Sequence, residues 1–460
     1  MTLQKLFITD IADSGAGIAW RQAAGRSVRV FVPGGLPGDV LEARLMPGPA
    51  GSHSLSARPE RFLQRSPSRR EKPFCPQACV CGGCPLAALS YPAQLDFKRR
   101  RLAELFRDIV PEGLIRPVLG LEPGERPVRN KALLHFAGRS EALSVGLYAP
   151  GSHRVLDQTA RCPQCPAWMG ETALAVARAG AKLGLGAWDE RRLEGALRAL
   201  LMRDAGEGGR LAALVTGEKL SAQALSRIRE AMRSAGVTSA SVCVNSEPGN
   251  APLRGEMTPI LGDGSVRVSL CGLGFRVRPE TFLQVNPLQT PRLYDLALSL
   301  AQIRPQDRVL DLYCGVGTLT LLAARQAREA FGVEIVRASV EEAERNAEAN
   351  GIRSARFACG PAAGILPEIA RAGFSPRIVI ADPPRKGLEA GVAEAISALR
   401  PEKVVYIACG PGALARDCRR FAQLGYRVSA LCPVDLFPET LHVETVCLLE
   451  PVRRADRRES

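Results

Sequence analysis

One cysteine near the C-terminal end of the chain stands where a nucleophile is expected. Cys409 follows the apolar run 404–408 and comes just before the amphipathic pattern 412–425, which predicts a strand that ends at a helix start. A thiol there lies near a helix N-terminus, which lowers its pKa and makes the thiolate available. A cysteine taken alone is more often a small buried apolar residue.

An acidic residue supplies the second half of such chemistry. Glu444 lies within the apolar run 443–449, where a carboxylate is costly to bury unless it has a task or a partner; an exposed strand position is the alternative. A thiolate that adds to one carbon of a conjugated double bond makes the neighbouring carbon nucleophilic, so that this carbon can take an electrophilic group and a base can remove its proton. We therefore predict Cys409 as the nucleophile and Glu444 as the base.

A strand, a glycine turn and a helix are predicted over residues 309–323. Gly315 and Gly317 allow a tight turn and close approach to a ligand, and Glu334 ends the next predicted strand, where it can bind ribose hydroxyls. The segment lacks the G-x-G-x-x-G spacing of dinucleotide enzymes, whereas D-x-x-C-G-x-G resembles the cofactor loop of S-adenosylmethionine-dependent methyltransferases. Asp382 follows a later strand, at the same predicted edge of the sheet.

Four further cysteines form a separate pattern. Cys75, Cys81 and Cys84 are closely spaced and Cys162 follows far downstream. Four thiolates suit either zinc or a four-iron cluster, and the residues alone do not decide between the two. Cys79 and Cys165 are additional thiols near these positions.

Composition points to an anionic partner. The chain of 460 residues has a formal net charge of +14 and 14 cysteines, which favour nucleic acid as the partner and metal or catalysis over disulfides. Lys5 and Asp10 interrupt any secretory pattern, and no apolar run reaches the roughly 20 residues that span a bilayer. We expect a cytoplasmic protein with no membrane partner.

The order of the predicted elements indicates an α/β protein of several domains. Short strands broken by glycine predict a small β-barrel over residues 1–65, and mixed strands and helices an α+β domain over 66–285, including one strand across 275–285. Strict alternation over 286–452 predicts a doubly wound, mostly parallel sheet. The charged tail 453–460 is predicted to be disordered.

Taken together, these motifs resemble the RNA uracil-5 methyltransferase family, whose members make 5-methyluridine. The resemblance covers essentially the whole chain in the family's order and is carried by "FLQVN" (282–286), "DLYCGVG" (311–317), "DPPRKGL" (382–388), "YIACGPGALARD" (406–417) and "DLFPETLHVETV" (435–446). It implies a Rossmann-like methyltransferase domain at the C-terminus and an RNA-binding TRAM or OB-like barrel at the N-terminus.

The resemblance also assigns roles to individual residues. It implies S-adenosyl-L-methionine as cofactor, bound by Gln284, Tyr313, Glu334 and Asp382. It further implies a four-iron, four-sulfur cluster on Cys75, Cys81, Cys84 and Cys162. Because the tRNA-specific branch usually lacks both barrel and cluster, 23S ribosomal RNA is the expected substrate, and we expect a monomer.

Three positions depart from the family pattern. Gly410 stands where the family usually has asparagine, and Thr318 and Pro361 replace polar cofactor-side residues. One alternative is therefore an iron–sulfur RNA-binding or assembly factor with weak or no turnover. Another is methylation of cytosine C5, although its usual second cysteine in a Thr-Cys or Pro-Cys pair is not visible.

Overall fold

The computed structural model describes residues 3–23, 26–48, 53–72, 74–249 and 253–452, so the predicted disorder of the tail 453–460 lies outside the described residues. The chain separates into two compact units. The first comprises Met1–Arg100, Ala149–Ser152 and Phe437–His442, and the second comprises Arg101–Tyr148, His153–Leu436 and Val443–Ser460. The predicted boundaries at 65 and 285 stay a prediction.

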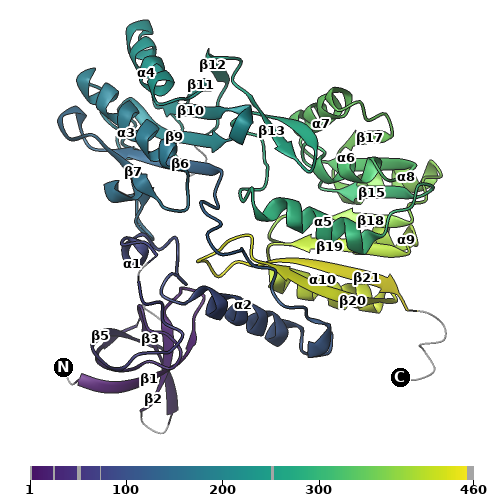
Figure 1. Cartoon of the computed structure of the whole chain (residues 1–460), viewed down its shortest axis with the longest axis horizontal. Coiled ribbons are helices and arrows are strands. Elements are labelled where there is room, and N and C mark those ends of the chain that lie inside the picture. Colours follow the sequence, from purple (N-terminus) through teal and green to yellow (C-terminus); the bar gives the residue numbers. More distant parts are fainter. Residues whose placement is uncertain (1–2, 24–25, 49–52, 73, 250–252, 453–460) are drawn as a thin grey trace. The chain divides into compact units, whose positions relative to one another are not determined.

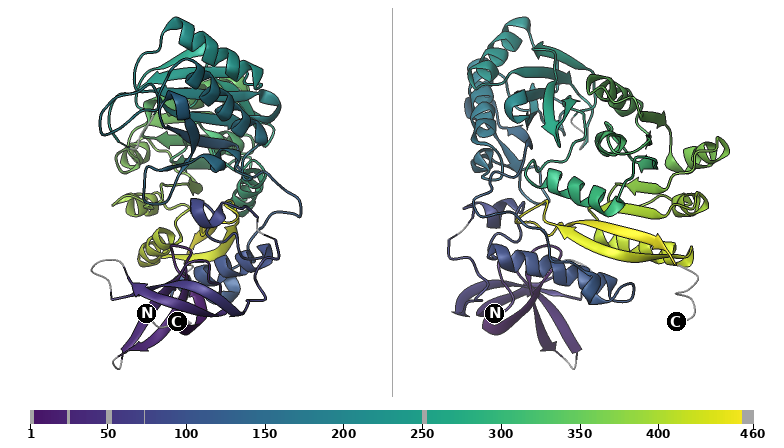
Figure 2. Two further views of the ribbon diagram at one scale, coloured as in Figure 1. Left: turned by 90° about the vertical axis from the view of Figure 1, so that its left-hand side faces the viewer. Right: turned by 45° about the vertical axis from the view of Figure 1, so that its right-hand side comes forward.

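The first unit contains a closed five-stranded barrel (Figure 1 and Figure 2), which confirms the predicted N-terminal barrel. Its order is β1-β2-β3-β5-β4, with β1 Leu3–Ile11, β2 Gly17–Ala23, β3 Arg26–Val32, β4 Val40–Pro47 and β5 Leu55–Gln64. Alternate apolar side chains, including Ile8, Val30 and Leu41, fill its interior, as period-two strands require. Helices α1 (Ala78–Cys81) and α2 (Tyr91–Phe106) follow in sequence.

The second unit begins with a seven-stranded sheet of order β12-β11-β10-β9-β6-β7-β8. Its strands are β6 Lys131–Ala137, β7 Ser144–Tyr148, β8 Val155–Leu156, β9 Leu197–Asp204, β10 Arg210–Thr216, β11 Ser239–Val244 and β12 Met257–Leu261. Helices α3 (Ala167–Lys182) and α4 (Ala222–Ser234) cover one face of it (Figure 1), with Met169, Val176 and Ile228 in the shared core. This confirms the predicted α+β character of the region.

A second seven-stranded sheet has the order β17-β16-β15-β18-β19-β21-β20. The strands are β15 Arg308–Leu312, β16 Glu329–Glu334, β17 Ala355–Cys359, β18 Ile378–Ala381, β19 Lys403–Ala408, β20 Tyr426–Val434 and β21 Glu444–Pro451. The first five run parallel and β21 is antiparallel to both of its neighbours, so the prediction of a mostly parallel sheet is confirmed. All six residues of β19 are buried, which explains its continuous apolar sequence.

Helices cover this sheet and fix its strand ends (Figure 1). They are α5 Gln289–Ala301, α6 Thr318–Ala324, α7 Arg337–Ala349, α8 Ala362–Arg371, α9 Val392–Ala398 and α10 Pro411–Gln423. Helix α10 begins with Pro411 directly after Gly410, because proline needs no N–H in the first turn. Its apolar face, which includes Leu414, Cys418 and Phe421, packs into the core.

A hairpin of β13 (Val266–Leu270) and β14 (Leu273–Val277) precedes α5. The prediction of a strand across 275–285 is wrong beyond Val277: Pro279 has no N–H for a strand ladder, and Thr281 instead accepts a hydrogen bond from the backbone N–H of Arg278 through its hydroxyl, 3.0 Å away. Among the described residues, no helix is long and apolar enough to cross a membrane.

Candidate active site

Cys409 and Glu444 are brought together by the pairing of β19 with β21. The ladder pairs Ile407 with Val446 and Ala408 with Thr445. Cys409 directly follows Ala408 and Glu444 directly precedes Thr445, so both lie next to the last pair of the ladder, and the charge of Glu444 acts on the Cys409 thiol. Residues 35 positions apart in sequence are therefore neighbours at one sheet edge.

Asp382 joins this edge from the next strand, β18. Its backbone N–H donates to the carbonyl of Leu312 at 3.3 Å, and its carboxylate accepts from the Gln284 side-chain amide at 3.4 Å. Gln284 is itself buried. The two predicted cofactor residues Gln284 and Asp382 are thus in contact, 98 positions apart in sequence.

The thiol of Cys409 is not acidic. Burial, together with the nearby carboxylates of Glu444 and Asp382, raises its pKa to about 11, while Arg385 opposes the shift. The expectation that the start of α10 lowers this pKa is therefore wrong for the protein without substrate. Desolvation and two negative neighbours outweigh a helix terminus, whose effect is about 0.3–1 kcal/mol in most settings.

Glu444 is held in an environment that favours its neutral form. The residue is 2% exposed, and its Oε2 has no hydrogen-bond partner among the described residues. Burial, followed by the charge of Asp382, raises its pKa to about 8. A carboxyl whose pKa lies near neutrality is suited to accept and release a proton.

Two aspartates share this tendency. Burial raises the pKa of Asp382 to about 7, against the stabilising contact with Gln284. Asp311, inside β15, is 1% exposed, and burial also raises its pKa to about 7 although the Thr320 hydroxyl donates to it at 2.6 Å. The sequence reasoning used Asp311 only as part of a motif; an acid within the apolar run 309–312 is the signal that could have singled it out.

The glycine turn after β15 lies against the end of β16. The backbone N–H of Gly315 donates to Glu334 Oε2 at 3.1 Å, and the N–H of Val336 donates to Oε1 at 2.9 Å. Gly315 has a φ of 55°, and a Cβ built there meets no atom within 4 Å. The outer side of the turn is thus open, and the Glu334 carboxylate is fixed beside it, which fits a ligand that offers ribose hydroxyls.

Tyr313 occupies the first residue of that turn with a φ of 65°. This left-handed backbone is uncommon for a side chain other than glycine, asparagine or aspartate. The Tyr313 ring is half-buried, and desolvation, with a smaller effect of Glu389, raises its pKa to about 12. Tyr313 is therefore neutral at physiological pH.

Segment 282–286 is anchored from two sides. The Asn130 amide donates to the Gln284 carbonyl at 3.3 Å, and the Asn286 amide donates to the Leu436 carbonyl at 2.8 Å. Phe282 in the same segment is 69% exposed. Sequence reasoning missed Asn130 and Asn286 as supports of Gln284, because their partners lie 154 and 150 positions away.

The four predicted cluster cysteines are divided between the two compact units. Cys75, Cys81 and Cys84 belong to the first compact unit and Cys162 to the second. Within the described part of the chain, no group of three or more histidine, cysteine or acidic residues could hold a metal ion. A hydrogen bond with Cys165 is the main cause that lowers the pKa of Cys162 to about 6. The iron–sulfur cluster on these four cysteines therefore stays a prediction.

The departures from the family pattern have local consequences. A Cβ at Gly410 would lie 2.7 Å from the backbone oxygen of Arg385, so the loop after β18 occupies the space that an asparagine would need. Thr318 opens α6 and is buried, and Pro361 precedes the first residue of α8.

Comparison with known proteins bears on these features. The family model for tRNA (uracil-5-)-methyltransferases matches residues 264–452. A protein of Halalkalibacterium halodurans described as an uncharacterized RNA methyltransferase is 34% identical over 450 residues, 96% of each chain. One from Geobacter sulfurreducens with the same description is 33% identical and spans 100% of this chain and 92% of its own.

A solved structure shares the fold. The Pyrococcus abyssi tRNA (uracil-54, C5)-methyltransferase, solved with S-adenosyl-L-homocysteine, superposes with a TM-score of 0.77 at 24% identity and covers 97% of this chain and 99% of its own. The parallel sheet, the glycine turn and the acidic strand ends fit an S-adenosylmethionine-dependent methyltransferase, the class that the family model and the relatives show. The chain belongs to the RNA uracil-5 methyltransferase family, as the resemblance predicts, and acts on RNA as a methyltransferase of class EC 2.1.1.

Proposed function

We propose that the protein methylates C5 of a uridine in RNA through a covalent adduct between Cys409 and C6. The observation that carries the proposal is that Cys409 and Glu444 both lie next to Ala408–Thr445, the last pair of the β19–β21 ladder, and interact electrostatically. A nucleophile and a base must reach adjacent carbons of one ring, and neighbours at one strand end suit that requirement.

The roles follow from bond changes at the ring. The Cys409 thiol loses its proton to solvent, and the thiolate forms a bond to C6 while the C5–C6 π electrons move toward C5 and O4. S-adenosylmethionine, when bound, supplies an electrophilic methyl group to C5. Glu444 as carboxylate then takes the C5 proton, the C5–C6 double bond returns, and the C6–sulfur bond breaks to release Cys409 as thiolate.

The same proposal assigns Gln284, Tyr313, Glu334 and Asp382 to the cofactor. Glu334 accepts hydrogen bonds from the ribose hydroxyls of the cofactor beside the open side of the glycine turn. Tyr313 packs its neutral ring against the cofactor. Gln284 orients Asp382 through the 3.4 Å contact between their side chains. The target uridine must leave any base stack to reach Cys409.

Replacement of the nucleophile tests the proposal. We expect Cys409→Ala to abolish 5-methyluridine formation while the affinity for RNA stays within about twofold, because phosphate contacts supply most of that affinity. The measurement is mass spectrometry of nucleosides from RNA incubated with enzyme and S-adenosylmethionine. Cys418→Ala, a buried thiol on α10, is the matched control. Normal methylation by Cys409→Ala would disprove the covalent mechanism.

We propose 23S ribosomal RNA as the substrate and transfer RNA as the second candidate. The ribosomal assignment rests on the resemblance of the barrel to a TRAM domain and on the four spaced cysteines. The tRNA candidate is favoured by the Pyrococcus abyssi enzyme, whose printed name gives tRNA uracil-54 and whose fold covers 97% of this chain, so a barrel does not by itself select ribosomal RNA. Methylation of each purified RNA, with mapping of the modified site, decides between them.

Two remaining alternatives are separated by other measurements. Tritium release from RNA labelled at uracil C5 is expected from the enzyme and absent from an inactive assembly factor, whereas release from cytosine-labelled RNA alone would support cytosine methylation. The support for an iron–sulfur cluster on Cys75, Cys81, Cys84 and Cys162 is their thiolate chemistry. Iron and sulfide analysis of anaerobically purified protein tests it. We also propose that the protein acts as a monomer in the cytoplasm, where its RNA substrate is made.

A further inference from the structure

A basic cavity lies within the second unit, apart from the residues proposed to react. It has a volume of about 410 Å³ and is bounded by the turn Gly206–Gly208, the β13–β14 hairpin and helix α7. None of the proposed catalytic or cofactor residues lines it. Its volume falls within the range of about 300–1,000 Å³ that is usual for small-ligand sites.

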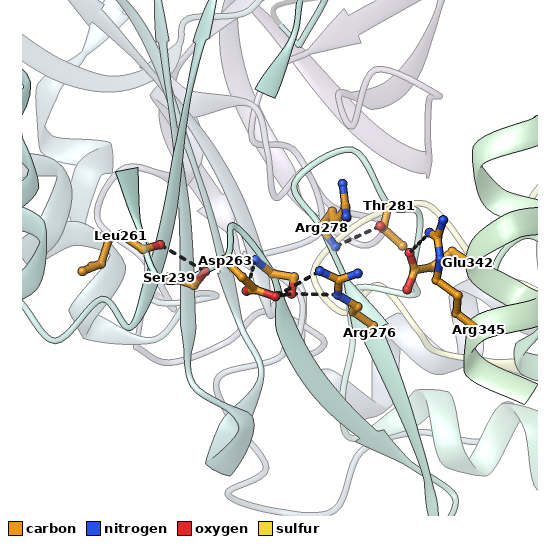
Figure 3. Close-up of polar contacts among 9 residues, drawn as sticks. Ser239, Leu261, Asp263, Arg276, Arg278, Thr281, Glu342 and Arg345 are labelled. Carbon is orange, nitrogen blue, oxygen red and sulfur yellow. Dashed lines mark hydrogen bonds and ion pairs between the residues drawn. The ribbon is translucent and has the colours of Figure 1, made fainter. Parts of the chain in front are cut away.

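Three guanidinium groups and one carboxylate give the cavity its charge. Arg267 and Arg276 come from the hairpin, and Arg345 and Glu342 come from α7. Figure 3 shows Arg276, Glu342 and Arg345. These four groups are among the lining residues, and Asp263 and Glu341 offset part of the positive charge through ion pairs with Arg276 and Arg345. Guanidinium is well suited to phosphate because of its forked donors.

Arg276 is held in place by its surroundings. Its backbone N–H donates to Asn346 Oδ1 at 2.9 Å, which ties the hairpin to α7. Its side chain donates to Ser265 Oγ and to Asp263 Oδ2, each at 3.0 Å (Figure 3). A guanidinium that is already oriented loses less side-chain entropy when a ligand binds.

Arg267 lies across the backbone of the neighbouring strand. A Cβ at Gly274 would lie 2.1 Å from its Nε and 2.5 Å from its Nη2, so the absence of a side chain at Gly274 makes room for the guanidinium. Arg267 is nevertheless exposed. One face of its guanidinium therefore rests on β14, and the other is available for a planar group to stack on.

Glu342, which lines the cavity, carries a buried acceptor without a donor in the described part of the chain. The residue is 4% exposed, its Oε2 accepts from Arg345 Nη1 at 3.3 Å, and its Oε1 has no partner in the part of the chain that the structure describes. A buried carboxylate oxygen without a donor is costly. The cavity thus combines a place for an anion, a planar surface and a need for hydrogen-bond donors.

We propose that this cavity binds an unpaired guanosine nucleotide of the RNA substrate. Guanine is the base whose Watson–Crick edge carries two adjacent donors, N1–H and the N2 amino group, which match the two oxygens of a carboxylate. Adenine and cytosine set a ring acceptor beside their amino group, and uracil flanks its single N–H with carbonyls. The base stacks on Arg267 and donates to Glu342, while Arg276 and Arg345 hold the phosphate.

The proposal rests on RNA as substrate but not on the covalent mechanism, so it is tested without turnover. The full chain, saturated with S-adenosyl-L-homocysteine to fill the cofactor site, is titrated with 5′-GMP and with 5′-AMP by calorimetry at low salt. We expect GMP to bind about tenfold more tightly than AMP, as one bidentate pair provides. Equal affinities for the two nucleotides would overturn the proposal.

Variants then locate the binding. Glu342→Gln should bring GMP and AMP within about twofold, because glutamine offers only one acceptor. Arg267→Ala should lower the affinity for GMP at least fivefold. Arg353→Ala, which removes the same charge at an exposed position outside the cavity, should leave that affinity unchanged. Thermal midpoints check folding. If Glu342→Gln does not fold, Arg267→Ala decides, and unchanged GMP affinity there would contradict the site.

Discussion

The second unit places two kinds of ionisable site on one scaffold. At the strand ends around Cys409, carboxyl and thiol groups are removed from water, and burial is the first cause of each raised pKa. In the arginine cavity, by contrast, Arg267 and Arg345 are exposed, and the hairpin's Arg276 is fixed by hydrogen bonds. Desolvation thus prepares groups for proton transfer, whereas exposed, oriented charge prepares a surface for phosphate.

The largest effect is expected from removal of the proposed base. We expect Glu444→Gln to slow release of 5-methyluridine by about 10²–10⁴-fold, the usual contribution of a general base. Because the C5 proton then stays in place, a covalent enzyme–RNA adduct should accumulate on a denaturing gel. A free enzyme with normal turnover would show that another group is the base.

Stability should depend on pH in a direction set by the same carboxyl. Burial raises the folded-state pKa of Glu444 to about 8 from 4.5, so its contribution to stability is complete below pH 4.5 and is lost as pH rises through 8. Glu444→Gln should therefore match the wild type near pH 5 and be more stable near pH 9, by on the order of a few kcal/mol.

Urea unfolding followed at both pH values measures that difference. Glu348→Gln, an exposed position on α7, is the control and should not change the pH dependence. If Glu444→Gln lost as much stability as the wild type between pH 5 and 9, Glu444 would not be the neutral buried acid described here.

The rate of alkylation of the Cys409 thiol should depend on the charge of Glu444. With Glu444 ionised, its charge raises the pKa of Cys409, so Glu444→Gln should move the midpoint of iodoacetamide alkylation at Cys409 to lower pH and speed alkylation about tenfold near pH 9. Peptide mass spectrometry follows the reaction, and Cys359, which is also half-buried, serves as an internal reference. An unshifted profile would mean that the two side chains do not interact.

A smaller effect is expected from substitution of Gly410, the residue next to Cys409. A Cβ at Gly410 would lie 2.7 Å from the Arg385 oxygen, whereas a Cβ at Gly412 meets nothing within 4 Å. Gly410→Ala should destabilise the protein by about 1–3 kcal/mol through overpacking and lower turnover severalfold, while Gly412→Ala should be neutral or stabilising within α10. Thermal midpoints and initial rates measure both, and equal behaviour of the two variants would contradict the close packing.

The contrast between the two sites also shows what a sequence can reveal. Alternating apolar runs predicted the mostly parallel sheet. The motifs around Cys409 and Glu444 predicted a nucleophile and a base. The pairing of β19 with β21, which brings Cys409 and Glu444 to the same end of the ladder, depends on a strand order that local patterns do not encode. The pKa of Cys409 was predicted in the wrong direction because burial and neighbouring charges belong to the folded chain.

The arginine cavity was not predicted at all. Arg267, Arg276 and Arg345 are spread among 61 lysines and arginines and follow no motif. Their common setting arises when Asn346 binds the hairpin backbone. The absence of a side chain at Gly274 leaves room for Arg267 and is a local signal of the cavity. Its meaning depends on which strand lies beside Gly274.

The most direct test of the account uses RNA that carries 5-fluorouridine at the target site. Fluorine replaces the C5 proton that Glu444 must remove, so methyl transfer proceeds and elimination cannot follow. We predict a peptide in which Cys409 carries the methylated fluoronucleotide, detected by mass spectrometry after nuclease and protease digestion and absent without S-adenosylmethionine. Methylated RNA without an adduct, or an adduct on a different cysteine, would contradict the assignment of Cys409 as the nucleophile.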